Sequence, residues 1–296
     1  MSGRSAAHGR TPAPPFPPPC HVPGPDGPWE EVQERIERTG RAVVHTTWGQ
    51  WLTPALLDPG LRTLLGRDWP RYRQHPAPAG RLSLAVSRVV LKHTAAAALQ
   101  VPAERLDLAY LPGGRPVLRG LGADLQVSLS HTDELIVVGV SRAGPVGVDA
   151  EPAGRRISFE ALRDHVCTAE EAELLAALPE EERTEGFLRL WTLKEAYTKA
   201  LGHGMRRRFS AFGFGRDAAG TVRLTGDTAG EWAFATHLVE ERFLVSEAHR
   251  QDAAPAAPGG ARAPSSADEP GRPPSAEPPH GARVIGFPGR QSPGQR

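Results

Sequence analysis

Two acidic motifs, separated by about 40 residues, contain the side chains best suited to chemistry. Residues 147–151 read Gly-Val-Asp-Ala-Glu, and residues 191–199 read Trp-Thr-Leu-Lys-Glu-Ala-Tyr-Thr-Lys. The first motif is typical of a strand end, where Asp149 and Glu151 share a face. The second is typical of a helix, and a helix packed across the strand end would bring Glu195 to the same place. Three carboxylates around one point form an oxygen-rich site suited to Mg²⁺.

Lysines flank the third carboxylate, and each motif also has an ordinary structural interpretation. Lys194 and Lys199 beside a Mg²⁺ site indicate a phosphate-bearing substrate. Alternatively, Asp149 and Glu151 belong to a solvated strand end, and Glu195 and Lys199 form a surface pair four residues apart on a helix. The strand before Asp149 is apolar, and acids at its end are costly to bury unless they are solvated or paired with a cation. This position supports the metal site, whereas the helix taken alone favours the surface pair.

The composition excludes several classes of protein. The chain has 296 residues, with 35 Lys+Arg against 34 Asp+Glu, so its charge gives no reason to expect binding to nucleic acid or membrane. Its two cysteines, Cys20 and Cys167, indicate neither a disulfide framework nor a zinc cluster. We find no apolar run of membrane-spanning length and no signal peptide. We expect a cytoplasmic, soluble monomer.

Glycine and proline concentrate at the two ends of the chain. Residues 1–28 and 251–296 consist largely of Pro, Gly, Ala and polar residues. Such segments bury too little apolar surface to offset the entropy of ordering the chain. The sequence therefore predicts two disordered tails around a folded part that spans residues 29–250.

The hydrophobic pattern of the folded part predicts helices and strands without strict alternation. The pattern predicts helices over 81–99, from 168 to just before Pro179, and over 181–201, the second beginning with a Thr-x-x-Glu capping box. It predicts strands over 41–47, 106–110, 125–130, 135–140, 146–149, 221–224, 232–238 and 243–246. This order favours an α+β fold with mainly antiparallel sheets.

Three further groups of residues could bind anions, although each has a structural alternative. Ser130 and His131 are adjacent and do not face each other, so a Ser/His nucleophile is not favoured, but His131 could bind a phosphate. Arg81, Arg88 and Lys92 share one helix face, which on its own reads as a solvated surface. Residues 113–116, Gly-Gly-Arg-Pro, form a turn and match neither a phosphate-binding loop nor a dinucleotide fingerprint.

Taken together and in order, these segments resemble the 4′-phosphopantetheinyl transferases. The similarity is to the larger, Sfp-like type that activates peptide and polyketide synthetases, in the branch with Trp and Lys-Glu-Ala. It spans about residues 71–211. The matching segments are 114–116, 128–132, 146–151, 187–199 and 202–204.

The resemblance implies a fold and a set of ligands. The fold is a pseudo-dimer of two similar α+β halves, 29–144 and 145–250, each a small, mainly antiparallel sheet with a long helix. Coenzyme A is bound in the cleft between the halves. Mg²⁺ is held by Asp149, Glu151 and Glu195, and Mn²⁺ accepts the same oxygen ligands.

The resemblance also implies the contacts of coenzyme A. Lys194 and Lys199 lie beside its phosphates, and Ser130 and His131 lie against the nucleotide, with His131 at the 3′-phosphate. Further contacts come from three arginines, Arg81, Arg88 and Arg115. The family usually has Lys where this chain has Arg115, and the two cations differ in geometry.

The implied activity is that of a holo-carrier-protein synthase. A serine of an apo acyl or peptidyl carrier protein receives 4′-phosphopantetheine, and 3′,5′-adenosine bisphosphate is released. Glu195 or Glu151 accepts the serine proton, and Lys199 stabilises the leaving phosphate. Two alternatives are another Mg²⁺-dependent phosphoryl enzyme and a non-catalytic module that binds carrier proteins. The full set of acidic and basic residues argues against the second.

Overall fold

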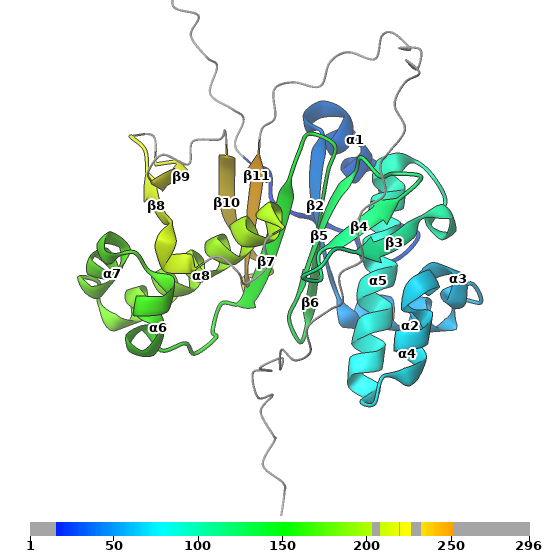
Figure 1. Ribbon diagram of the computed structural model, residues 1–296, viewed down its shortest axis with the longest axis horizontal. Coiled ribbons are helices and arrows are strands. Elements are labelled where there is room, and N and C mark those ends of the chain that lie inside the picture. The colour runs from blue at the N-terminus through cyan, green and yellow to red at the C-terminus, as the bar shows by residue number, and fades with distance from the viewer. Residues whose placement is uncertain (1–15, 203–207, 219, 226–231, 251–296) are drawn as a thin grey trace, which may run out of the picture. The chain divides into compact units, whose positions relative to one another are not determined.

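Two small β-sheets form the centre of the fold. The structure is a computed structural model that describes residues 16–202, 208–218, 220–225 and 232–250 (Figure 1). All of them belong to one unit, which spans residues 1–255. The predicted tail 251–296 lies outside the described residues, as does the segment 1–15.

The first sheet has the strand order β1-β2-β6-β5. The strands are β1 (Cys20–His21), β2 (Arg41–Thr47), β5 (Gln126–His131) and β6 (Leu135–Ser141). β6 pairs with both β2 and β5 in antiparallel fashion, whereas the short β1 runs parallel to β2. Every residue of β6 is buried, as its continuous apolar sequence predicts.

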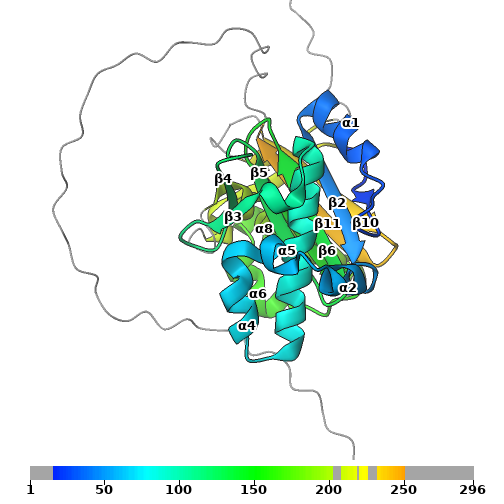
Figure 2. The ribbon, with the colours of Figure 1, turned by 90° about the vertical axis from the view of Figure 1, so that its right-hand side faces the viewer.

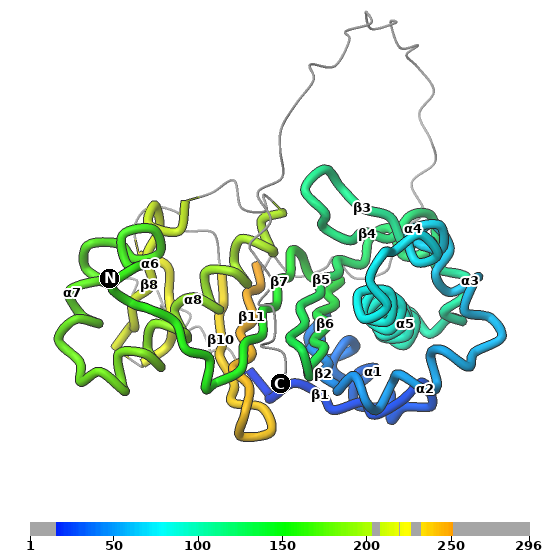
Figure 3. The backbone as a smooth tube through the Cα atoms, turned by 90° about the horizontal axis from the view of Figure 1, so that it is seen from below, coloured from blue at the N-terminus to red at the C-terminus, as the bar shows by residue number. Residues whose placement is uncertain are grey.

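The second sheet is antiparallel throughout and has the order β10-β11-β7. Its strands are β10 (Trp232–Val239), β11 (Phe243–Arg250) and β7 (Val146–Pro152). β7 lies alongside β5 and β6 (Figures 1 and 3). Valines from both sheets share one hydrophobic cluster, among them Val43, Val137, Val148 and Val245. The edge of the second sheet that holds the acidic motif therefore faces the first sheet.

Two long helices cover the sheets. α5 (Pro78–Leu99) packs on the first sheet (Figure 2), and α8 (Glu180–Leu201) packs on β7 and β11. Seen from below, the two helices lie on opposite sides of the paired sheets (Figure 3). α8 approaches β7 very closely at Gly147, where an added Cβ would lie 1.9 Å from the carbonyl oxygen of Ala196. The absence of a side chain at Gly147 therefore sets the distance between helix and strand.

Shorter elements complete the unit. The helices are α1 (Glu30–Thr39), α2 (Trp48–Leu57), α3 (Leu61–Leu65), η1 (Gly66–Asp68), α4 (Trp69–Gln74), η2 (Ala103–Arg105), α6 (Phe159–Val166), α7 (Ala169–Ala176) and η4 (Phe209–Ala211). Two hairpins are formed by β3 (Asp107–Tyr110) with β4 (Pro116–Arg119) and by β8 (Gly213–Arg216) with β9 (Val222–Thr225). The predicted capping box at Thr168 and Glu171 is present.

The predicted α+β class with mainly antiparallel sheets is confirmed. The division into two similar halves at residues 144 and 145 stays a prediction. From the sequence we expect no apolar run of membrane-spanning length. α5 contradicts this, because its length and composition would allow it to span a membrane. However, 72% of its most apolar window is buried inside the protein. It contributes much of the hydrophobic cluster beneath the first sheet.

The prediction of a disordered tail over residues 1–28 is wrong for residues 16–28. Cys20 and Val22 are buried, and β1 pairs with β2. The indole of Trp51 donates a hydrogen bond to the Val22 carbonyl at 2.9 Å. The ring of Phe16 stacks on His249 of β11 and lies under the guanidinium of Arg41 of β2. The segment therefore contacts both sheets, and its two buried side chains outweigh its high content of Pro and Gly.

This segment should contribute to stability. Removing residues 1–28 exposes the surface that Cys20 and Val22 cover, which costs about 1.5 kcal/mol or more for a buried aliphatic side chain. We expect thermal denaturation to show a Tm at least roughly 5 °C below that of the full chain. A variant lacking only residues 1–15 is the control, because it keeps every described contact. Equal Tm values for the two truncations would contradict this role.

The contact at Gly147 should tolerate no side chain. Gly147→Ala places a methyl group against the backbone of α8, so the helix must move, and we expect a loss of several kcal/mol in urea denaturation. Gly154→Ala is the matched control, since nothing lies within 4 Å of its added Cβ. If the two variants unfold at the same urea concentration, α8 does not depend on Gly147.

Candidate active site

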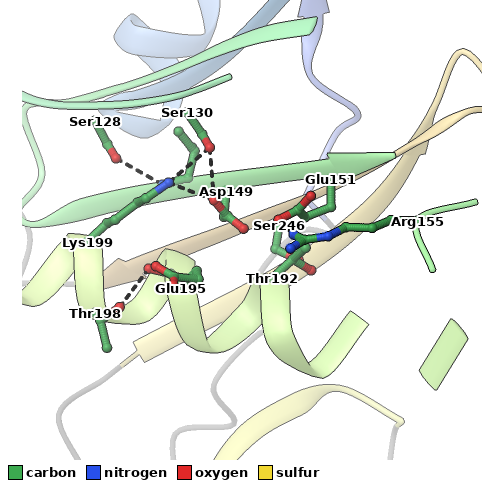
Figure 4. A network of polar contacts seen from close by, with 11 residues as sticks. Ser128, Ser130, Asp149, Glu151, Arg155, Thr192, Glu195, Thr198, Lys199 and Ser246 are labelled. Atoms are coloured by element: carbon green, nitrogen blue, oxygen red, sulfur yellow. Dashed lines mark hydrogen bonds and ion pairs between the residues drawn. The ribbon is translucent and has the colours of Figure 1, made fainter. Parts of the chain in front are cut away.

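The acidic motif and α8 meet where the two sheets adjoin. Asp149 lies opposite Ser246 in the pairing of β7 with β11, and the Ser246 hydroxyl is 2.7 Å from the hydroxyl of Thr192 on α8. This contact places α8 over the face of β7 that bears Asp149 and Glu151. Figure 4 shows Lys199 reaching from α8 to this face.

Asp149 is the centre of a buried polar network. The hydroxyl of Ser130 on β5 donates to Asp149 Oδ1 at 2.9 Å. Lys199 Nζ donates to the same oxygen at 2.7 Å and to the Ser130 hydroxyl at 2.9 Å. Asp149 Oδ2 is buried and has no hydrogen-bond partner in the described part of the chain. The first sheet, the second sheet and α8 therefore each provide one member of this network.

Glu151 and Glu195 lie close enough to Asp149 to feel its charge. Burial raises the pKa of Glu151 to about 7, and Asp149 adds to this rise, while the neighbouring Arg155 opposes it. Burial also raises the pKa of Glu195, again with a contribution from Asp149. The carboxylate of Glu151 pairs with Arg155 (Figure 4). The side chain of Glu195 makes no hydrogen bond with any described residue.

The donor set fits a divalent cation, although the three carboxylates do not converge as the side chains stand. Among the described residues, no group of three Asp, Glu, His or Cys side chains is arranged to hold a metal. Lys199 and Arg155 occupy the carboxylates of Asp149 and Glu151 instead. The unpartnered Oδ2 of Asp149 and the raised pKa values of both glutamates show that the burial of these carboxylates is costly even with Lys199 and Arg155 beside them. Mg²⁺ would offset that cost, and the three-carboxylate site stays a prediction.

A pocket of about 270 Å³ opens beside Lys199. Its wall consists of the turn 113–116, Ser128 and Leu129 of β5, Glu195, Thr198 and Lys199 of α8, and Gly202. The pocket therefore joins the predicted nucleotide turn to the predicted metal ligand Glu195, although the two lie about 80 residues apart in the chain.

Arg115 connects this turn to the end of α8. Its guanidinium donates to the Ala200 carbonyl at 3.2 Å and to the side-chain oxygen of Gln126 at 3.0 Å. A cation at this position is favourable, because the last carbonyl groups of a helix carry partial negative charge. Gly202 has φ of 72°, and a Cβ there would lie 2.8 Å from Arg115 Nη1. Arg115 lines the pocket and also holds the two segments together, and its contact with coenzyme A stays a prediction.

The predicted phosphate-binding residues divide into two groups. His131 stands at the exposed end of β5, with the ring of Trp48 edge-on at 5.5 Å. Partial burial lowers the pKa of His131, and the positive charges of Arg88 and Lys199 act in the same direction. Arg88 and His131 lie on α5 and β5, which pack against each other. Arg81 lies in the first turn of α5, about 10 Å along the helix from Arg88, and makes no side-chain hydrogen bond with any described residue.

Lys194 does not belong to the site, which corrects its predicted contact with coenzyme A. Its ammonium is fully buried and donates to Glu171 at 2.6 Å. Its nitrogen also lies 2.7–2.9 Å from the carbonyl oxygens of Val166, Phe209 and Phe212, so its three N–H bonds are shared among four acceptors. Lys194 therefore links α8 to α7, to the end of α6 and to the segment around η4.

Two features of the site had no signal in the sequence. Arg155 follows β7 and pairs with Glu151, but no motif marks it. Likewise, the contact between Thr192 and Ser246 joins residues 54 positions apart. Only the packing of α8 on the second sheet could reveal it.

Comparisons with known proteins agree with the geometry. Residues 145–253 match the model of the 4′-phosphopantetheinyl transferase superfamily. The 4′-phosphopantetheinyl transferase HetI of Nostoc sp. is 30% identical over 147 residues, which cover 49% of this chain and 62% of HetI. The 4′-phosphopantetheinyl transferase psf-1 of Bacillus pumilus is 27% identical over 171 residues, 57% of this chain and 71% of that protein. The chain thus spans about two thirds of the length of these relatives.

Among solved structures, the chain is similar to the holo-[acyl-carrier-protein] synthase of Thermotoga maritima. The match has 24% sequence identity and a TM-score of 0.30, and it covers 35% of this chain and 61% of that chain. A score at this level supports no inference about the site.

The buried ion pair of Lys194 should stabilise the fold rather than bind a ligand. Lys194→Met leaves the Glu171 carboxylate buried without its cation, which costs about 3–5 kcal/mol. We expect urea denaturation to show this loss, and the double variant Lys194→Met/Glu171→Gln to recover part of it. Arg189→Met, at an exposed pair on the same helix, is the control and should cost less than about 1 kcal/mol. A fully stable Lys194→Met protein with weakened coenzyme A binding would restore the original prediction.

Proposed function

We propose that the chain is a member of the 4′-phosphopantetheinyl transferase superfamily, whose model matches residues 145–253, and that it transfers 4′-phosphopantetheine from coenzyme A to a serine of an apo carrier protein. The observation that supports this most is the network of Asp149, Lys199 and Ser130 beside Glu195, at a pocket bounded by the turn 113–116. It combines acidic metal ligands with a lysine, which suits a pyrophosphate substrate.

The proposed reaction is a displacement at phosphorus. The serine oxygen of the carrier forms a bond to the β-phosphorus of coenzyme A. The bond from that phosphorus to the bridging oxygen breaks, and 3′,5′-adenosine bisphosphate leaves. Glu195 is our candidate for the base that accepts the serine proton, because its carboxylate makes no hydrogen bond with the described residues, whereas Arg155 holds Glu151.

The chain's own residues would orient the substrate. Asp149, Glu151 and Glu195 would hold Mg²⁺ or Mn²⁺, which supplies charge neutralisation at a pyrophosphate when bound. Lys199 would exchange its contact with Asp149 for one with the leaving phosphate. His131 and Arg88 would bind the 3′-phosphate, and Ser130 would lie against the nucleotide.

The partner is a carrier protein of the acyl or peptidyl class. The decisive experiment is mass spectrometry of several apo carrier proteins incubated with the full chain, coenzyme A and Mg²⁺. We expect at least one carrier to gain the mass of one phosphopantetheine group. No gain in any carrier would refute the proposal. Hydrolysis of coenzyme A without a carrier would instead indicate another phosphoryl enzyme, and carrier binding without mass gain would indicate a non-catalytic module.

The carboxylates should be needed for turnover but not for folding. Asp149→Asn and Glu195→Gln each remove a negative charge at nearly constant volume, and we expect a loss of about 100-fold or more in kcat. Glu185→Gln, at an exposed ion pair on the same helix, is the control and should keep normal activity. Circular dichroism checks the fold. Near-normal turnover at saturating Mg²⁺ would remove the altered residue from the active site.

A further inference from the structure

Arg88 is held between two side chains that no sequence motif identified. Asp68 ends η1, and Tyr110 ends β3. The Tyr110 hydroxyl donates to Asp68 Oδ2, and Arg88 Nε lies 3.4 Å from the same oxygen. The guanidinium of Arg88 also lies over the Tyr110 ring, 5.2 Å from its centre. The charge of one carboxylate and one aromatic face therefore hold the same arginine, whose buried Nε makes no hydrogen bond.

Burial makes it costly for Asp68 to lose its contacts with Tyr110 and Arg88. The side chain of Asp68 is only 6% exposed and that of Arg88 15%. A buried carboxylate without its partners costs several kcal/mol, so Asp68 keeps both. Burial also raises the pKa of Tyr110 far above its usual range, with Asp68 adding to the rise. The phenol therefore stays protonated and remains a donor to Asp68.

These contacts leave part of the Arg88 guanidinium free. Nε lies 3.4 Å from Asp68 as an ion pair but makes no hydrogen bond, and Nη1 lies 3.4 Å from the Ser87 hydroxyl. Nη2 makes no hydrogen bond with any described residue. α5 packs on β5, which ends at His131, and the charge of Arg88 helps to lower the pKa of His131. A guanidinium fixed along one edge presents its other donors to an anion in a single orientation.

We propose that Asp68 and Tyr110 are positioning residues that hold Arg88 in the orientation in which it binds a phosphate beside His131. The inference rests on the proposed function, in which that phosphate is the 3′-phosphate of coenzyme A. Asp68 and Tyr110 do not touch the substrate; they act through Arg88.

The alternative is that the two residues only attach η1 to β3, and the chain contains a matched control for it. Arg67 and Asp107 join the same two elements through an exposed ion pair with an N–O distance of 2.9 Å. That pair includes neither Arg88 nor Asp68. Its loss would loosen the attachment of η1 to β3 without releasing Arg88.

The test compares the binding of coenzyme A and of dephospho-coenzyme A, which lacks the 3′-phosphate, by calorimetry on the full chain. We expect Asp68→Asn to weaken coenzyme A by about 5- to 20-fold, as expected for a partly lost charge-assisted contact, and Tyr110→Phe by about 3-fold. Both variants should bind dephospho-coenzyme A within about 2-fold of the wild-type protein. Asp107→Asn should change neither affinity.

A double-mutant cycle separates positioning from a general structural role. In an Arg88→Gln background, Asp68→Asn should weaken coenzyme A by less than about 2-fold, because there is no longer an arginine to position. Equal weakening of both ligands by Asp68→Asn, or an effect of Asp107→Asn as large as that of Asp68→Asn, would overturn the inference. If circular dichroism shows that Asp68→Asn does not fold, Tyr110→Phe decides, and an unchanged preference for coenzyme A refutes positioning.

The wild-type protein tells the two proposals apart. If the wild-type protein binds coenzyme A and dephospho-coenzyme A equally well, it does not bind the 3′-phosphate. That result overturns the inference whatever the carrier assay shows. A protein that prefers coenzyme A through Asp68 and Arg88 but modifies no carrier would support the positioning of Arg88. It would at the same time refute the proposed transfer.

Discussion

The close approach of α8 to β7 is the constraint on which the site depends. Because Gly147 has no side chain, the backbone of α8 at Ala196 rests directly on the strand. Asp149 follows two residues later on β7, and Glu195 and Lys199 lie within about one helical turn of Ala196. A larger residue at position 147 would move these two side chains away from Asp149 together. The position of α8 along β7 therefore also sets the positions of Glu195 and Lys199 relative to Asp149.

That packing creates an electrostatic cost, which the chain partly offsets with its own cations. Burial and mutual repulsion raise the pKa values of Glu151 and Glu195. Lys199 and Arg155 supply positive charge at Asp149 and Glu151. An arrangement of this kind is rarely the most stable choice, since apolar side chains of similar size would often do as well or better. This buried group of acids and cations therefore fits a role in chemistry better than a role in stability.

The sequence predicted the two long helices, α7 and most strands, but not α1, α2, α3, α4, α6, β1, β4 and β8, and not which way every side chain faces. The pattern of β6, the capping box at Thr168 and the length of α8 follow from local periodicity. The sequence places Lys194 beside coenzyme A because it is next to Glu195. This prediction is wrong, since neighbouring residues on a helix point about 100° apart. Only the packing of α6, α7 and η4 shows that Lys194 faces the core. Similarly, composition marked residues 16–28 as a tail, although Cys20 and Val22 suffice to dock them.

The site draws on both sheets, and this has a physical consequence for binding. Ser130 and His131 belong to the first sheet, whereas Asp149 and Glu151 belong to the second, and Arg115 spans from the turn 113–116 to the end of α8. A ligand that contacts His131 at one end and Lys199 at the other is held by the first sheet and by α8, the helix that packs on the second sheet. Its binding energy would then stabilise their contact as well as the ligand's own orientation. Residues such as Asp68, which act on one end only, can therefore change affinity without altering the acids at the other.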